Sequence, residues 1–136
     1  SYNVDKNKET RRKANGRMGE EIATKFLVSK GFKVIDRNYR KPWGEIDIIA
    51  EKDAVLHFVE VKTVSCENIA SVSRESAYRP EEQAHKWKLK KVARTAELYM
   101  EAKSSLAEKD FQVDVIGVLL DINTRRARCR FFEQVL

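Results

Sequence analysis

Apolar residues recur along the chain first at the spacing of a helix, then at that of strands, and later at helical spacing again. The first pattern ends at the helix stop Gly31 and predicts a helix over residues 16–30. Apolar runs bounded by turn residues predict strands, with a second helical pattern between them. In chain order we expect strands at 32–40, 45–51 and 54–63, a helix over about 81–103, and strands at 111–121 and 125–135.

This order of elements, αβββαββ, predicts one α/β domain in which a mixed sheet is flanked by helices. The second and third strands are joined by a tight Lys52–Asp53 turn, so we expect them to be antiparallel neighbours. Residues 64–80 break all periodicity and predict a long loop. Residues 1–13 are polar and basic and lack periodicity, which indicates a flexible arm, so the single domain is expected to cover residues 14–136.

The composition is that of a folded domain with a basic surface. Of the 136 residues, 42% are hydrophobic and 35% charged, and the formal net charge is +6, so wholesale disorder is not expected. An excess of Lys and Arg favours polyanionic partners such as nucleic acid, although many basic proteins bind none. Cys66 and Cys129 match no metal-ligand spacing, and we find no signal peptide and no apolar run of about 20 residues. We therefore expect a cytoplasmic protein without a membrane segment.

One predicted hairpin, GEIDIIAEKDAVLHFVEVK at residues 44–62, carries charged residues inside its apolar runs. The period of a strand is two, so Glu60 and Lys62 project from the same face, and Asp47 lies in the partner strand within reach of Glu60. Two converging carboxylates repel each other, and a divalent cation such as Mg²⁺ relieves that repulsion. The alternative is a strand whose polar face is simply exposed to solvent.

A third carboxylate comes from the first predicted helix. Glu20 lies at the edge of the apolar face of that helix, so its side chain is expected to point toward the hairpin. Its alternative role is to complement the dipole of the first helical turn. A lysine in the position of Lys62, beside a metal held by carboxylates, can orient or deprotonate water or neutralise charge on a phosphate.

Four ordered blocks of the sequence resemble the YraN family of bacterial proteins, which is similar in turn to the PD-(D/E)XK nuclease superfamily and to archaeal Holliday-junction resolvases. The blocks are G-R-x-G-E-x-x-A at 16–23, R-N-Y-R at 37–40, G-E-I-D-I-I-A at 44–50 and F-V-E-V-K at 58–62. The resemblance covers about residues 14–120 and implies a restriction-endonuclease-like core. Two features depart from the pattern: Ile46 stands where the superfamily has proline, and the 64–80 loop is longer than usual.

The resemblance implies a role for each matching residue. Asp47 and Glu60 would bind Mg²⁺ or Mn²⁺, and Lys62 would be the catalytic lysine. Glu20 would assist metal or water binding, and Val61 would contribute a main-chain carbonyl. All four charged side chains are therefore expected to be catalytic.

Basic and aromatic residues outside the hairpin are candidates for nucleic-acid binding. Phosphate contacts need positive charge, and exposed aromatics can stack on bases. The candidates are Lys88, Arg37, Arg40, Trp43, Lys86, Lys91 and Arg74. Lys88 also falls where the resembled family commonly has a lysine, and it would otherwise be an ordinary solvated lysine. Trp43 would otherwise be a packing residue of its turn.

We expect from these features a metal-dependent endonuclease that hydrolyses phosphodiester bonds of DNA, with structured or branched DNA as substrate. The alternative is a non-catalytic nucleic-acid-binding or scaffold protein with the same fold. A third hypothesis is a dimerising accessory factor, because resolvase-like relatives act as dimers, although no interface can be identified in the sequence. His57 alternates onto the face of Val59 and is expected to be a hydrogen-bonded core histidine.

Overall fold

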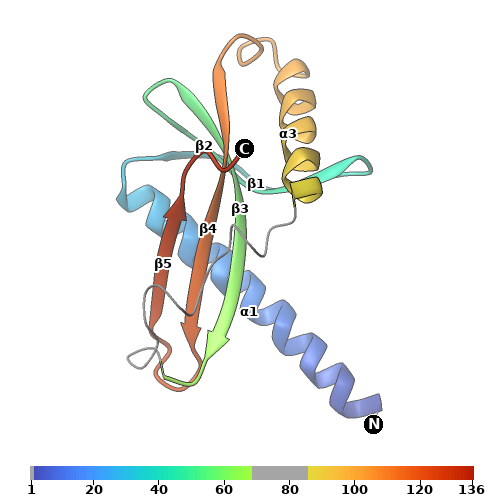
Figure 1. Ribbon diagram of the computed structural model, residues 1–136, viewed down its shortest axis with the longest axis vertical. Helices are drawn as coiled ribbons and strands as arrows, with labels where there is room; N and C mark the ends of the chain where they lie inside the picture. The colour runs from blue at the N-terminus through green and yellow to red at the C-terminus, as the bar shows by residue number, and fades with distance from the viewer. Residues whose placement is uncertain (1, 69–85) are drawn as a thin grey trace.

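The protein folds as a five-stranded mixed sheet with a helix packed on each face, and the computed structural model describes residues 2–68 and 86–136 (Figure 1). The sheet order is β1-β2-β3-β4-β5, in which β3 and β4 are parallel and the other neighbouring pairs of described strands are antiparallel. The predicted α/β class and the αβββαββ order are confirmed. The elements are α1 (Tyr2–Ser29), β1 (Lys33–Lys41), β2 (Gly44–Lys52), β3 (Val55–Cys66), α3 (Lys86–Glu101), β4 (Asp110–Asp121) and β5 (Ala127–Phe132).

Each face of the sheet has its own apolar core, because strands alternate their side chains between the two faces. The core under α1 contains Ala23, Leu27, Phe32, Ile48, Ala50, Val59, Ile116, Val118 and Leu120. The core under α3 contains Ile46, Ile49, Leu56, Phe58, Leu89, Val92, Ala96, Tyr99, Met100, Val113 and Val115. The central strands therefore have apolar residues on both faces, which is typical of a sheet covered on both sides.

α1 begins at Tyr2, not at the predicted residue 16, and its N-terminal end projects beyond the sheet (Figure 1). Residues 2–15 are rich in Lys and Arg, which favour helix without requiring an apolar face. Residues 10–13 are exposed, so this part of the helix lacks the periodicity on which the sequence prediction depended. The division into a 1–13 arm and a 14–136 domain stays a prediction.

The hairpin between β2 and β3 turns at Asp53 and Ala54, one residue later than predicted. Both have positive φ, 51° and 66°, and Lys52 pairs with Val55 across the turn. Two consecutive residues with positive φ match the right-handed twist of the flanking strands. The predicted antiparallel pairing is confirmed.

β3 continues to Cys66, three residues into the segment predicted as a loop. Residues 64–66 show no clear strand pattern in the sequence. The parallel ladder with β4 nevertheless supplies hydrogen-bond partners as far as the Cys66–Asp121 pair. The remainder of the predicted 64–80 loop from residue 69 on, and the predicted helix start at 81–85, lie outside the described residues.

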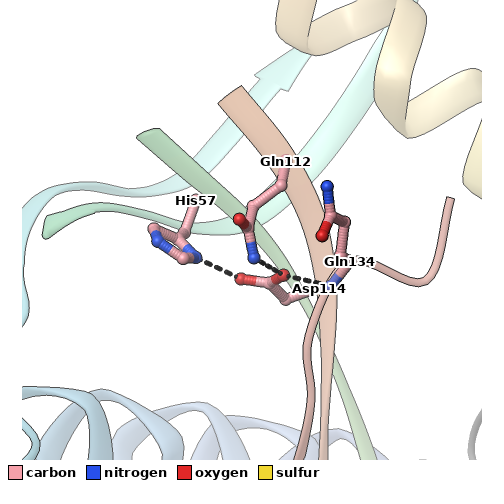
Figure 2. A network of polar contacts seen from close by, with 4 residues as sticks. All are labelled: His57, Gln112, Asp114 and Gln134. Atoms are coloured by element: carbon pink, nitrogen blue, oxygen red, sulfur yellow. Dashed lines mark hydrogen bonds and ion pairs between the residues drawn. The ribbon is translucent and has the colours of Figure 1, made fainter. Parts of the chain in front are cut away.

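A buried polar network fastens the C-terminal segment to the sheet, as Figure 2 shows. The carboxylate of Asp114 is fully buried, and its Oδ2 lies 2.5 Å from Nδ1 of His57. Its Oδ1 accepts hydrogen bonds of 2.8 Å from the Gln112 side chain and from the Gln134 main-chain N–H. The His57 ring also packs edge-on against Phe32. The prediction of a hydrogen-bonded core histidine at position 57 is confirmed.

Candidate metal centre

β2 and β3 separate at the point where the sequence places its carboxylates. Their described pairing runs from Lys52 and Val55 to Ile48 and Val59, so Asp47 and Glu60 are the next residues on each strand. The Val61 N–H donates a 2.8 Å hydrogen bond to Asp47 Oδ2. The Asp47 carboxylate thus satisfies a main-chain donor of β3 where the strands part.

The regular alternation of β2 is broken at the same point. Ile46 packs under α3, whereas Ile48 packs under α1, although residues two apart in a regular strand share a face. Asp47 lies between them and is half-buried. Because of this irregularity, Asp47 interacts with Glu20 of α1 on one side of the sheet and with Lys88 of α3 on the other. In a regular strand its side chain would face one side alone.

Glu60 lies on the α3 side of β3, two residues after the core residue Phe58. Its Oε1 lies 2.7 Å from Nζ of Lys88 on α3, and only 11% of its side chain is exposed. Burial, followed by the negative charge of Asp47, raises the Glu60 pKa to about 7 despite the hydrogen bond from Lys88. Burial likewise raises the pKa of Asp47, although the Val61 N–H opposes that shift.

Glu20 reaches the pair from α1, as predicted. Burial, followed by the negative charge of the nearby Asp47, raises the pKa of Glu20, although the charges of Arg40 and Arg37 oppose that shift. The structure therefore brings Glu20, Asp47 and Glu60 into one electrostatic group, with Asp47 in the middle.

Gly19 brings α1 close enough to β3 for Glu20 to reach Asp47. A Cβ at Gly19 would lie 1.9 Å from Oγ1 and 2.9 Å from Cβ of Thr63. The glycine is therefore needed for the close approach of the helix to the strand.

We expect Gly19→Ala to destabilise the protein by about 1–3 kcal/mol, because the helix must move away from Thr63 to make room for a methyl group. The matched control is Gly16→Ala in the same helix, where a Cβ meets nothing within 4 Å. Alanine favours helix over glycine, so the control should be stabilised by about 0.5–1 kcal/mol. Urea unfolding of both variants measures the difference, and equal effects would contradict the close packing of α1 on Thr63.

A hollow of about 240 Å³ opens beside Glu60, between the β1–β2 turn and α3. Its lining combines the carboxylates of Glu45 and Glu60 with the ammonium groups of Lys41, Lys88 and Lys91. Gly44, at the start of β2, lines it as well, and a Cβ there would lie 2.0 Å from Thr95 Oγ1 of α3. The hollow can therefore receive an anionic group next to the buried carboxylates.

Of the other predicted site residues, Arg40 and Trp43 lie beside this hollow, whereas Lys62 and Arg37 are not among its lining residues. Arg40 forms a 2.8 Å ion pair with Glu45 at its rim, and Trp43 in the adjacent turn is 49% exposed. Lys62 is exposed on β3 beyond Glu60. Arg37 lies farther along β1 and pairs with Glu21 of α1 at 3.0 Å.

Two predicted residues cannot be placed in the same way. Arg74 lies outside the described residues, and only the backbone of Lys86 is described, in the first turn of α3. Sequence reasoning also missed Lys41 as a lining residue and Lys88 as the partner of Glu60. The Pro42-Trp43-Gly44 turn that follows Lys41 could have indicated its position beside the hollow. No local sequence pattern indicates the ion pair between Glu60 and Lys88.

The donor set of the site fits Mg²⁺ or Mn²⁺. Mg²⁺ is commonly held by one or two carboxylates, with waters and phosphate oxygens completing its shell, and Asp47 and Glu60 supply such a pair. Burial raises the pKa of both carboxyls, and the charge of Asp47 raises that of Glu60 further, so a bound cation would favour their ionised forms. Within the described residues, no three His, Cys, Asp or Glu side chains are grouped closely enough to form a metal site by themselves. The site thus requires oxygen ligands from water or substrate.

We expect the metal-free protein to lose stability as the pH rises from about 4.5 to about 7. The folded protein holds the Glu60 proton more tightly than the unfolded chain does, since folding raises the pKa from 4.5 to about 7. The free energy of unfolding is therefore highest below pH 4.5, the pKa of Glu60 in the unfolded chain. It falls by on the order of 3 kcal/mol until the pH passes about 7, the pKa in the folded protein. Urea unfolding in EDTA at about pH 5 and about pH 8 measures the loss. Glu60→Gln should flatten the dependence, and an unchanged slope in that variant would refute the assignment.

The fold and the carboxylate pair define an α/β protein whose mixed five-stranded sheet is consistent with a restriction-endonuclease-like core. No helix among the described residues is long and apolar enough to cross a membrane. The chain belongs to the family described as "Uncharacterised protein family UPF0102", whose model matches residues 19–118. The resemblance to YraN-like proteins is thereby confirmed at the level of the family, and the matched range includes Glu20, Asp47, Glu60 and Lys88.

Relatives from several bacteria cover most of the chain. A UPF0102 protein of Campylobacter hominis is 43% identical over 99 residues, which are 73% of this chain and 78% of that protein. One from Campylobacter jejuni is 38% identical over 108 residues, 79% of this chain and 86% of that protein. One from Sulfurihydrogenibium is 42% identical over 103 residues, 76% of this chain and 82% of that protein.

Proposed function

We propose that this protein is a divalent-metal-dependent nuclease of the PD-(D/E)XK superfamily, which hydrolyses phosphodiester bonds of DNA with Mg²⁺ or Mn²⁺. The observation that carries the proposal is the convergence of Asp47 and Glu60 where β2 and β3 separate, beside a lysine-lined hollow. Buried carboxylates that repel each other are unfavourable for stability alone. Their arrangement is explained if they hold a cation.

Each side chain then has a distinct task. Asp47 and Glu60 hold the cation, and the Val61 N–H fixes the orientation of the Asp47 carboxylate. A bound Mg²⁺ or Mn²⁺ supplies the positive charge that polarises a phosphate and activates water. Lys62, two residues after Glu60 on the same face of β3, would orient the attacking water and neutralise charge that builds on the phosphate. Glu20, whose charge interacts with that of Asp47, would assist in holding the cation or its bound water.

The surface around the hollow supports a nucleic-acid substrate. Lys41 and Lys91 line it, and Arg40 stands at its rim, so a phosphate backbone would meet positive charge. Trp43, which is half-exposed in the next turn, can stack on an unpaired base. Unpaired bases are accessible in branched DNA, and we therefore propose branched or otherwise structured DNA as the preferred substrate.

A cleavage screen tests the proposal. The purified protein is incubated with duplex, single-stranded, flap and four-way-junction DNA in Mg²⁺, in Mn²⁺ and in EDTA. We expect metal-dependent cleavage that favours branched substrates. Glu60→Ala, purified in parallel, identifies contaminating nuclease. No metal-dependent cleavage of any substrate would overturn the proposal.

A second candidate function is that of a non-catalytic nucleic-acid-binding protein. It is favoured by the ion pair of Lys88 with Glu60, which already supplies positive charge to the carboxylates without a metal. Under this alternative the protein binds DNA equally well in EDTA and in Mn²⁺ and cleaves nothing. Calorimetric titration with Mn²⁺ in the presence of DNA separates the two functions, since the binder would show no metal affinity.

A further inference from the structure

The Lys88 ammonium lies among the carboxylates of the candidate metal centre. Its Nζ is 2.7 Å from Glu60 Oε1. Burial alone would lower the Lys88 pKa, but the hydrogen bond and charge of Glu60, with the charges of Asp47 and Glu45, raise it. A raised pKa keeps the ammonium charged over the whole physiological range. The Lys88 ammonium therefore already offsets part of the negative charge of Glu60, Asp47 and Glu45.

α3 fixes the base of this lysine but leaves its end able to move. Leu89 and Val92, one and four residues after Lys88 on α3, are buried in the core, so the backbone of Lys88 is held against the sheet. The Lys88 side chain itself is 47% exposed and lines the hollow together with Lys41 and Lys91. The ammonium can thus leave Glu60 for the hollow by rotating its own side chain, while the helix stays in place.

We propose that Lys88 is a resident counter-cation of this site, which competes with the divalent cation for Glu60 and turns to a substrate phosphate once the cation binds. The inference rests on the proposed function and adds an order of binding to it. A divalent cation on Glu60 would lie within a few ångströms of the ammonium, and two such cations repel each other. The metal must therefore displace Lys88, and a phosphate placed in the hollow would give the displaced ammonium a new anionic partner.

The competition has a measurable consequence for metal affinity. Lys88→Gln removes the competing charge and should bind Mn²⁺ about fivefold more tightly than the wild-type protein, the effect of one partly exposed ion pair. Lys88→Arg keeps the positive charge and should bind Mn²⁺ with near wild-type affinity. The matched control is Lys91→Gln, which removes the same charge from the same helix and hollow without touching the Glu60 ion pair. Its affinity should change by about twofold at most.

Isothermal titration calorimetry of the full-length variants with Mn²⁺ at about pH 8 tests the inference, with thermal unfolding as the check that each variant is folded. Tighter binding by Lys88→Gln, together with unchanged binding by Lys88→Arg and Lys91→Gln, is the expected result. Equal or weaker binding by Lys88→Gln, with Mn²⁺ still bound by the wild-type protein, would overturn the role of Lys88 alone. If neither protein bound Mn²⁺, the metal-dependent function and the competition would both be overturned.

Discussion

Replacing Glu60 by Gln is expected to lower metal-dependent DNA cleavage by on the order of a thousandfold, because the site would lose the charge stabilisation that a bound cation provides. Gln has nearly the same shape, and its amide oxygen can still accept the hydrogen bond from Lys88. Glu60 is buried with a pKa raised to about 7, so removing its charge should leave the fold at least as stable at neutral pH. A loss of cleavage in Glu60→Gln would therefore reflect a lost metal ligand and not a loss of folding.

Asp47→Asn should have a comparable effect on cleavage. The Asn side-chain oxygen can still accept the hydrogen bond from the Val61 N–H, so the separation of β2 and β3 is kept. A suitable control is Glu21→Gln, since Glu21 is exposed on α1 and pairs with Arg37 away from the hollow. Single-turnover cleavage rates in Mn²⁺ compare the three variants. Activity that persists in both Asp47→Asn and Glu60→Gln would mean that these carboxylates do not hold the catalytic metal.

Asp114→Ala is expected to destabilise the protein by about 3–5 kcal/mol, because each buried group left without its hydrogen-bond partner costs about 1–3 kcal/mol. The Asp114 carboxylate is fully buried and bridges three groups, from β3, β4 and the C-terminal segment (Figure 2). Its removal leaves His57 and the Gln134 N–H without their partner. The C-terminal segment should be released first, because apart from this bond it is held by the hydrogen bond from Val135 N–H to Val113.

Gln112→Ala is the matched control for Asp114, because it removes one donor from the same carboxylate and keeps the other two. It should destabilise by about 1 kcal/mol. Urea unfolding gives both values, and hydrogen exchange at Gln134 reports the release of the C-terminal segment. A loss of less than about 1 kcal/mol in Asp114→Ala would show that the network contributes little to the fold.

The sheet and the carboxylate pair were accessible from the sequence because both depend on local regularities. Apolar runs between turn residues located the strands, and the period of two placed Glu60 on the opposite face from Val59 and Val61. The tight turn made β2 and β3 neighbours, and Asp47 and Glu60 are the residues that follow their last described pair. Glu20 was found for a similar reason, from its position on the edge of a helical face.

Features that depend on distant contacts were not accessible. The break in alternation places Ile46 and Ile48 in different cores, and no local pattern in the sequence encodes it. The partner of His57 is Asp114, 57 residues later, and that of Glu60 is Lys88, on another element. The early start of α1 was missed for a different reason, since residues 2–15 show no apolar period in the sequence.

A metal centre at Asp47 and Glu60 is tested most directly by locating bound Mn²⁺ in a crystal of the full-length protein, by anomalous diffraction at the manganese edge. We expect an anomalous peak between the carboxylates of Asp47 and Glu60, with the Lys88 ammonium moved away from Glu60. No peak at that position, with Lys88 still paired with Glu60 at saturating Mn²⁺, would contradict a metal centre at this site.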